Sequence, residues 1–567
     1  MDKITGYIAV VFMSAAVTAC SLDEKVYTQI DESYVTDAEM AESVLLGVYR
    51  DLNVDGIYRW NLSMMFNLPT DEAKIEGSSL VAERLEGCNA YSASSSHVQK
   101  TWAALYKAVY DANYFLEMME RRSPDFPEED AALCDIYVAE ARFLRGLLYF
   151  ELVRWFGHVP LVTSTAESYL PSDQIEQADP VKVYEFIEKD LQYAVDNLPY
   201  ASQDDVRPDN KFRVSKGGAL GLLAKVYATW AGYPLQDGAK WELAAEIAGL
   251  LVTSGQHSLL PDFEQLWRNS GSNAWDPTES LFELSFWSPL STNESSGRFG
   301  NWNGVRAVAG GLSGGNHGHN AWYRICPTFL TGWKDWQNDR RWALSYADYQ
   351  YTKEGKVNMV QKTIDGVLTD ITFRMAFEAT DPDYNDSWRT LYSLHLFPRK
   401  WDTEIYVPED KQLIDNNYTN VNWYILRYAD VLLLYAEALN EVNRGPTPEA
   451  YEAVNMVRRR GYGLDFSSPS MAADLQAGMD YETFRQAVRD ERSYELAFEG
   501  HRRQDLVRWG IYCDTVIETY QNLTDWCDTA PDYYLGGLYT KKGKNELLPI
   551  PQREKDLCVK FKQNPEW

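Results

Sequence analysis

The clearest hydrophobic pattern in the chain lies in residues 424–460. At ~3.6 residues per turn, apolar side chains fall on one wide helical face and charged side chains on the other. Gly445 interrupts the pattern, Thr447 suits the start of a second helix, and Gly461 can end it. Alanines at the seam allow close packing. The pattern predicts two antiparallel helices, as in TPR-like stacks, although periodicity alone equally fits a helical hairpin of any α protein.

Helical patterns recur along most of the chain, in pairs separated by Gly and Pro. They predict further helices at residues 37–52, 102–121, 130–156, 180–198, 215–231, 240–254 and 481–499. The predicted fold class is therefore mainly α, a TPR-like scaffold of about eight paired helices.

The composition changes between Leu281 and Asn422, where helical spacing fades and Gly, Asn, Ser, Thr and Trp become frequent. Residues 356–377 alternate weakly and predict a β-hairpin with Gly366 at the turn. We interpret residues 286–422 as a loop- and hairpin-rich insertion that binds the ligand. It separates an N-terminal helical region, residues 37–285, from a C-terminal one, residues 423–567.

The first nineteen residues are typical of a secretory signal, with Lys3 before a short apolar run. The sequence Val17-Thr18-Ala19-Cys20 fits a lipobox, so we expect lipid on Cys20 and a tether over residues 20–36. A plain signal peptide followed by an incidental cysteine is the alternative. Past this segment no apolar run of about 18 residues follows, so lipid is the expected membrane attachment.

The net charge of −29 argues against nucleic acid as a partner and against a polybasic grip on anionic lipid. The chain also has 19 Trp and 37 Tyr, more than packing usually requires. An acidic, aromatic-rich protein suits a neutral ligand that stacks on rings, and sugars are the obvious class. Plain solubility would explain the charge without any ligand.

Aromatic residues in polar loops are the best candidates for such a site, because sugar CH groups pack on rings and sugar hydroxyls bond to polar groups at the rim. Trp302 lies between two asparagines, and Trp322 and Tyr323 lie between Asn320 and Arg324. The expected ligand-binding set from the insertion is Trp287, Asn301, Trp302, Asn303, Asn320, Trp322 and Tyr323.

Motifs for catalysis or metal binding are weak. Residues 311–315 match GxSxG, but the glycines that follow do not favour the helix that a nucleophile elbow needs. His317 and His319 lack a third ligand nearby. We expect no catalytic residues, no metal and no cofactor. For the six cysteines after Cys20 we expect buried free thiols, with a Cys513–Cys527 disulfide as the alternative.

Three segments carry a family resemblance: RYADVLLLYAEALNE, RDERSYELAFEGHRRQDLVRWG and the ending LLPIPQREKDLCVKFKQNPEW. Together they closely resemble the SusD/RagB family of glycan-binding surface lipoproteins of Bacteroidetes-type bacteria. The resemblance implies a C-terminal tail that closes on the helical body. It also implies that the region after the first helix contributes to ligand binding, which adds Asp71, Arg84 and Tyr91 to the candidates and draws attention to Trp60.

The resemblance further implies a lipid-anchored protein on the outer face of the outer membrane. Such a protein captures an oligosaccharide or polysaccharide without catalysis and passes it to a SusC-like TonB-dependent transporter. Two rivals stay open: a RagB-like protein that captures peptides, and a surface glycosidase, which would need two facing carboxylates.

Overall fold

The computed structural model describes residues 32–76, 81–288, 295–307, 320–352, 354–378, 389–392, 394–412, 417–528 and 534–567. The expected lipid site Cys20, the GxSxG match at 311–315, and both His317 and His319 lie outside the described residues.

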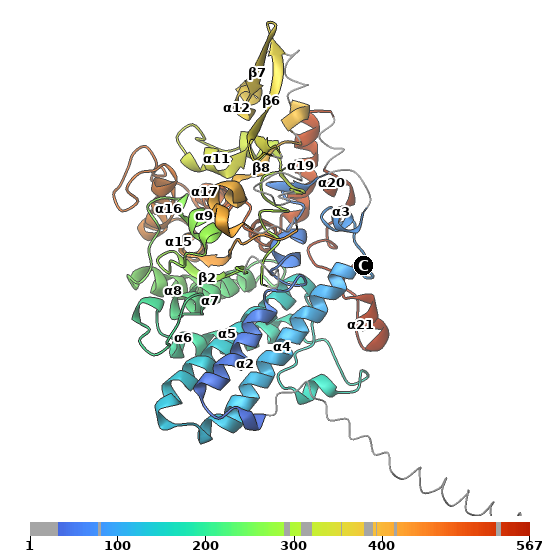
Figure 1. Cartoon of the computed structure of the whole chain (residues 1–567), viewed down its shortest axis with the longest axis vertical. Coiled ribbons are helices and arrows are strands. Elements are labelled where there is room, and N and C mark those ends of the chain that lie inside the picture. The colour runs from blue at the N-terminus through green and yellow to red at the C-terminus, as the bar shows by residue number, and fades with distance from the viewer. Residues whose placement is uncertain are drawn as a thin grey trace, which may run out of the picture.

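Long helices form one continuous array in which each packs on the next (Figure 1). The array confirms a mainly α, TPR-like fold, and α2, α4 and α5 lie side by side at its lower end. Its members are α2 (Ala38–Asp51), α4 (Ser96–Arg122), α5 (Ala131–Phe156), α6 (Pro180–Asn197), α7 (Lys216–Ala231), α8 (Lys240–Thr253), α15 (Tyr428–Asn443), α16 (Pro448–Gly461) and α17 (Tyr481–Glu495).

Side-chain caps explain where several of these helices begin. The Asp37 carboxylate accepts a hydrogen bond from Met40 N at 2.9 Å, and Asp480 accepts one from Thr483 N at 2.8 Å. Thr447 caps α16 in the same way, with Pro448 at the first helical position. Each cap satisfies a backbone N–H that the helix itself leaves without a partner.

The helix expected from Tyr424 begins only at Tyr428, so that part of the prediction is wrong. The preceding residues form β9 (Trp423–Arg427), which pairs antiparallel with β2 (Ser280–Leu284). Trp423, Tyr424 and Leu426 of β9 are buried, and β9 packs on β2 and α7. Strand pairing therefore overrides the helical spacing of this segment.

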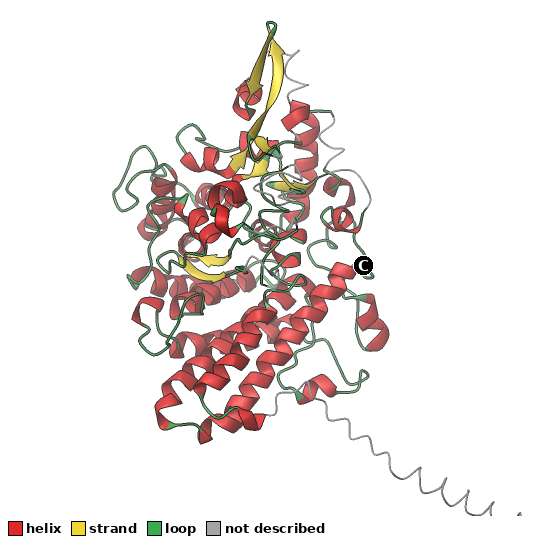
Figure 2. Ribbon diagram, in the orientation of Figure 1, coloured by secondary structure: helices red, strands yellow, loops and turns green. Residues whose placement is uncertain are grey.

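The β2–β9 pair marks where a long insertion leaves and rejoins the array, because α8 packs directly on α15. Helix α9 (Gln265–Ser272) precedes β2. Between β2 and β9 lie β3 (Tyr323–Ile325), α10 (Pro327–Thr331), α11 (Arg340–Ser345), β4 (Tyr346–Ala347), β5 (Tyr349–Tyr351), β6 (Val357–Ile364), β7 (Val367–Ile371), α12 (Phe373–Glu378), β8 (Phe397–Pro398), η7 (Arg399–Trp401) and α14 (Thr403–Tyr406). These elements are short, and loops connect them (Figure 2).

Strands of the insertion take part in three small antiparallel sheets in the described residues: β3 pairs with β1 (Ala73–Ile75) of the N-terminal region, β4 pairs with β8, and β5 pairs with β6 and β6 with β7. The β6–β7 hairpin projects from the top of the molecule (Figure 1). Gly366, with φ +80°, lies at its turn, as the alternation predicted.

The C-terminal tail closes on the helical body. The remaining α-helices are α3 (Ala82–Glu86), α18 (Arg502–Arg508), α19 (Tyr512–Trp526), α20 (Gly536–Tyr539) and α21 (Gln552–Leu557). The hydrophobic pattern of the sequence did not predict α19. Leu548 N donates to the carbonyl of Trp155 at 2.7 Å, and the Asn564 amide donates to Phe156 O at 2.9 Å. Both acceptors lie at the C-terminal end of α5, so the tail satisfies carbonyls that the helix leaves open.

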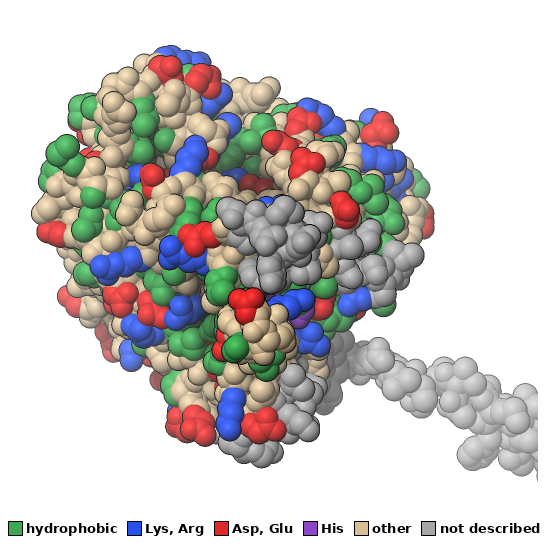
Figure 3. Space-filling view, turned by 90° about the horizontal axis from the view of Figure 1, so that it is seen from above, with side chains coloured by type: hydrophobic (Ala, Val, Ile, Leu, Met, Phe, Trp, Pro, Cys, Tyr) green, Lys and Arg blue, Asp and Glu red, His purple; other side chains and the backbone are tan. Residues whose placement is uncertain are grey.

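The surface is polar and mixed. Seen from above, hydrophobic, acidic and basic side chains are interspersed over the visible face (Figure 3). No helix among the described residues combines the length and the apolar character that a membrane crossing requires.

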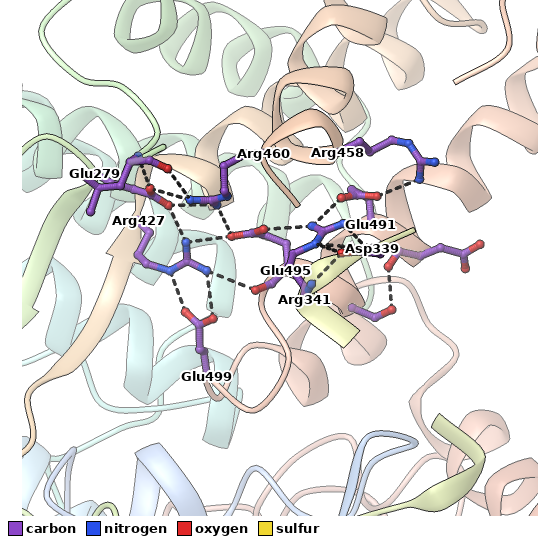
Figure 4. Close-up of polar contacts among 12 residues, drawn as sticks. Glu279, Asp339, Arg341, Arg427, Arg458, Arg460, Glu491, Glu495 and Glu499 are labelled. Carbon is purple, nitrogen blue, oxygen red and sulfur yellow. Dashed lines mark hydrogen bonds and ion pairs between the residues drawn. The ribbon is translucent and has the colours of Figure 1, made fainter. Parts of the chain in front are cut away.

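A network of buried ion pairs joins the insertion to the array (Figure 4). The Glu495 carboxylate lies 2.6 Å from the Arg460 guanidinium and 3.0 Å from those of Arg427 and Arg341. Glu279 shares Nη1 of Arg427 with Glu495, and Glu499 binds Nε of Arg427; the Glu279 and Glu499 distances are both 2.7 Å. Further members are Asp339, Lys400, Arg458 and Glu491.

The arginines decide the charge state of this network. Burial alone would raise the pKa of Glu495, but the positive charges of Arg460, Arg427 and Arg341 hold that pKa well below its ordinary value. The carboxylate therefore stays ionised, and the guanidiniums keep their partner.

We predict that Glu495→Gln destabilises the protein by about 3–5 kcal/mol, because it leaves three buried guanidiniums short of one negative charge. Chemical denaturation followed by circular dichroism measures the change. Glu482→Gln on the same helix is the matched control, since its ion pair with Arg485 is exposed and contributes about 0–1 kcal/mol. Equal effects of the two substitutions would contradict a structural role for the network.

All six cysteines in the described part of the chain are buried free thiols. Burial raises the pKa of Cys88 to about 12 and that of Cys134 to about 11. We predict that the chain of residues 21–567 shows almost no reaction with a thiol reagent when native and six reactive thiols after denaturation without reductant. Two fewer thiols would instead reveal a Cys513–Cys527 disulfide.

Candidate functional site

Aromatic rings and arginines from distant parts of the chain form one stack. We call it the aromatic–arginine stack. Its members in spatial order are Tyr418, Arg298, Trp60, Trp302, Trp322 and Arg84.

The contacts along the stack are close. Arg298 Cζ lies 5.1 Å from the Tyr418 ring centroid and 4.2 Å from that of Trp60. The Trp60 and Trp302 centroids are 5.2 Å apart with an interplanar angle of 29°, and Trp302 meets Trp322 edge to face at 4.7 Å. Arg84 Cζ lies 5.0 Å from the Trp322 centroid. These separations are in the range of favourable aromatic and cation–π interactions.

A tight loop at residues 298–304 holds Trp302. Trp302 N donates to Arg298 O at 3.2 Å, and Gly300 N donates to the Asn303 side-chain oxygen at 2.8 Å. Gly304 approaches the carbonyls of Gly300 and Trp401 so closely that an added Cβ would lie 2.3 Å from each. The glycines in this sequence therefore serve to fold the loop around the ring.

The β1–β3 pair holds the other end of the stack. Glu76 N, just after β1, donates to Trp322 O at 2.6 Å, and Tyr323 N donates to Trp302 O at 3.0 Å. Arg84 comes from α3, eight residues after Glu76. The two strands thus bring segments near residues 75 and 322 together, with the 298–304 loop against them.

Trp60 and Arg298 are held from the N-terminal region. Trp60 immediately precedes a short π-helix, η2 (Asn61–Met65), and its ring packs edge to face on His97 at 5.6 Å. The Asp55 carboxylate binds Arg298 through two hydrogen bonds of 2.7 and 3.1 Å. Asp55 therefore fixes the guanidinium between Tyr418 and Trp60.

The middle of the stack is buried and its ends are partly exposed. Trp60 and Trp302 are each only 8% exposed, whereas Trp322 and Tyr418 are partly exposed. Within the described residues, neither the Trp60 nor the Trp302 indole N–H has a hydrogen-bond partner, although both are buried. A buried donor without a partner costs about 1–3 kcal/mol, so the packing of these two rings is achieved at some cost in stability.

The structure brings most of the expected residues together, but it gives several of them scaffold roles. Asn303 folds the loop, and the Asn301 side-chain oxygen accepts from Asn320 N at 3.3 Å and Nδ2 at 3.1 Å. Tyr323 is buried in the second hydrophobic core, 5% exposed. These asparagines therefore position Trp302 and Trp322.

Other expected residues lie apart from the stack contacts. The Tyr91 ring stacks on Trp567 at 5.1 Å, and its hydroxyl accepts from Arg503 at 3.2 Å. Asp71 forms a two-bond ion pair with Arg502 of α18. Trp287 follows β2 and is partly exposed. The backbone N–H of the next residue, Ser288, donates a hydrogen bond to the side-chain oxygen of Asn420, which is two residues after Tyr418 in the sequence.

Sequence reasoning missed Tyr418, Arg298 and the contact of Trp60 with Trp302. Tyr418 lies in the run Asn416-Asn417-Tyr418-Thr419-Asn420, the same kind of polar loop that singled out Trp302. That signal could have found it. Nothing in the sequence places Trp60 against Trp302, because 241 residues separate them.

The chemistry available here is stacking and hydrogen bonding. In the part of the chain that the structure describes, no group of three His, Cys, Asp or Glu residues could hold a metal. Burial raises the pKa of Glu72 to about 8 and that of Asp402 to about 6. Both carboxyls are nearly fully buried; Glu72 bonds to Phe498 N and Asp402 to the Tyr349 and Tyr351 hydroxyls.

Comparison with known proteins gives a consistent result. The profile described as "SusD family" matches residues 312–567, and the one described as "Starch-binding associating with outer membrane" matches residues 22–228. SusD-like protein P25 of Formosa agariphila is 25% identical over 537 residues, 91% of each chain. A laminarin-binding SusD-like protein is 24% identical with a TM-score of 0.64, over 94% of this chain and all of that one.

The crystal structure of a SusD homolog from Bacteroides thetaiotaomicron is 47% identical, with a TM-score of 0.86. The match covers 95% of this chain and 99% of that one. This agreement over nearly the whole length, with the three sequence segments and the helical array, shows that the chain belongs to the SusD/RagB family.

Proposed function

We propose that this protein binds a glycan at the aromatic–arginine stack on the cell surface. It then passes the glycan to a SusC-like TonB-dependent outer-membrane transporter and catalyses no reaction. Membership of a family whose matched profiles include starch binding at the outer membrane supports the ligand class and the location. Lipid on Cys20 anchors the protein, and the helical body docks on the transporter.

The observation that carries the proposal is the partial exposure of Trp322 and Tyr418 on either side of the buried Trp60–Trp302 pair. A sugar ring can pack its CH face on either exposed ring. Arg298 and Arg84, which are partly exposed beside these rings, provide donors for its oxygens. Trp322 replaces Trp302 as the leading contact residue, because Trp302 is enclosed by Trp60 and Trp322.

Stacking of a few rings gives modest affinity, about micromolar to millimolar, because binding must also order a flexible polymer. The absence of turnover is part of the proposal. Glu72 and Asp402, two carboxyl groups with raised pKa, already bond to groups within the protein, which disfavours them as an acid–base pair across a cleft.

We predict that residues 21–567 are retarded by at least one polysaccharide in affinity gel electrophoresis. Trp322→Ala and Tyr418→Ala should each weaken binding about tenfold or more, equivalent to about 1.4 kcal/mol, because each removes a ring on which sugar packs. Trp302→Ala is less informative, because removing this buried ring leaves a cavity and lowers the free energy of unfolding by about 3–5 kcal/mol.

Trp241→Ala is the matched control, because Trp241 is partly exposed on α8, which packs on α7 and α15. If both stack variants are still retarded as strongly as the unchanged protein, the protein binds glycan but the binding site lies outside the stack. Lack of retardation across a broad panel would favour peptide capture. Release of reducing ends during incubation with polysaccharide would identify a glycosidase.

A further inference from the structure

A second place where aromatic rings meet a cavity lies on the helical array. It is a groove of about 370 Å³ between α4, the loop at residues 160–175 and the C-terminal segment at residues 554–561. We call it the α4 groove. None of the residues that line it belongs to the aromatic–arginine stack. Its volume is within the range of about 300–1,000 Å³ that is typical of ligand sites.

The walls of the α4 groove are fixed to one another by side chains. The Tyr106 hydroxyl on α4 donates to Pro160 O at 2.8 Å. The Glu117 carboxylate on the same helix accepts from both the backbone N and Oγ1 of Thr165, each at 2.7 Å. These bonds hold the loop against α4. The groove is therefore formed before a ligand arrives, and binding does not have to order its walls.

Aromatic rings form the α4 side of the groove. Trp102, Tyr106 and Tyr110 follow one another at intervals of four residues, so they share one face of the helix. The ring centroids of Trp102 and Tyr106 are 5.0 Å apart. Tyr110 meets Tyr169, which is 71% exposed, edge to face at 6.3 Å. Trp102 is buried, but Tyr106 and Tyr110 are partly exposed, so a ligand can reach their rings.

Polar groups lie around these rings. Ser168 is exposed, and Glu167 and Glu554 are partly exposed. The Lys107 side chain is 60% exposed, and its ammonium group already pairs with two aspartates at 2.7 Å. The charges that remain at the rim of the groove are those of carboxylates. They accept hydrogen bonds from hydroxyl groups and repel an anionic ligand.

A neutral carbohydrate fits this combination. Its CH groups pack on the rings, and its hydroxyls donate to the carboxylates and accept from Ser168 and Lys107. A peptide fits less well, because an extended peptide is recognised mainly through backbone hydrogen bonds. The α4 wall offers none of these, since the N–H and C=O groups within a helix bond to one another.

We propose that the α4 groove is a second glycan-binding site, which holds another part of the neutral polysaccharide that binds at the stack. This inference rests on the proposed function and adds a site to it. Two sites on one protein strengthen binding of a long polymer, because attachment at one site raises the local concentration of sugar at the other.

The test uses the same electrophoresis, with a polysaccharide that retards the unchanged protein. Tyr110→Ala should weaken retardation about tenfold, because one ring and the contribution of the second site are lost. Tyr110→Phe keeps the ring and should bind as the unchanged protein does. Ala103→Leu, at an exposed position of α4 that lines the groove, should also weaken binding, because the larger side chain occupies the groove. Circular dichroism verifies that each variant is folded.

Tyr539→Ala on α20 is the matched control, because Tyr539 is 39% exposed and does not line the groove. A double variant, Trp322→Ala with Tyr418→Ala, should keep weak retardation that the further change Tyr110→Ala removes.

Unaltered retardation of both Tyr110→Ala and Ala103→Leu overturns this inference but keeps the proposed function. A gel that contains gelatin tests the peptide alternative. If Tyr110→Ala reduces retardation by gelatin and leaves retardation by polysaccharide unchanged, the groove binds peptides and the inference is wrong. Lack of retardation by any polysaccharide overturns both this inference and the proposed function.

Discussion

Charge balance inside the protein is the constraint on which the rest of the structure depends. Ionic groups lose their hydration when they are buried, and the loss is recovered only if each charge meets partners at close range. Glu495 meets three guanidiniums, and Arg427 is shared by Glu279, Glu495 and Glu499. Because these groups come from α11, β9, α16 and the C-terminal end of α17, the elements can pack only in the arrangement that brings the charges together.

This constraint also positions the candidate site. Arg341 and Lys400 belong to the insertion, and their partners Glu495 and Glu499 lie at the end of α17 and just beyond it. Trp401, next to Lys400, approaches Gly304 in the loop that holds Trp302. The buried ion pairs thus fix the frame on which the stack is assembled. Within the described residues, the stack leaves the buried indole N–H groups of Trp60 and Trp302 without a hydrogen-bond partner.

Local rules predicted much of the helical array. Periodicity, with Thr447 as a cap, located most helix starts to within a few residues, although α4 begins six residues before its predicted start. Gly366 located a hairpin turn. The segment at Trp423–Arg427 was assigned to a helix, because its apolar residues fit the helical period as well as the strand period. Only pairing with β2, which is distant in the sequence, makes the segment a strand. The family segments supplied what periodicity could not, namely the overall architecture.

The site was harder to predict, because its defining contacts join residues that are far apart in the chain. Trp302 and Trp322 could be chosen from their polar Gly- and Asn-rich surroundings. The sequence could not predict how deeply these two rings are buried, because Trp302 is covered by Trp60, which is distant in the sequence. The asparagines next to Trp302 look the same in the sequence whether they face a ligand or fold a loop. Similarly, a net charge sums over the whole chain and says nothing of Lys74 and Arg324, which only strand pairing places face to face.

The closure of the insertion by β2 and β9 has a consequence for how such proteins can diverge. Since α8 packs on α15 without help from the residues between them, those residues can lengthen, shorten or change without moving the helices. The array would keep its packing while the residues around the candidate site are exchanged. The freedom has one limit: a transplanted insertion must bring its own counterparts of Asp339, Arg341 and Lys400, or carboxylates of the array are left uncompensated in the interior.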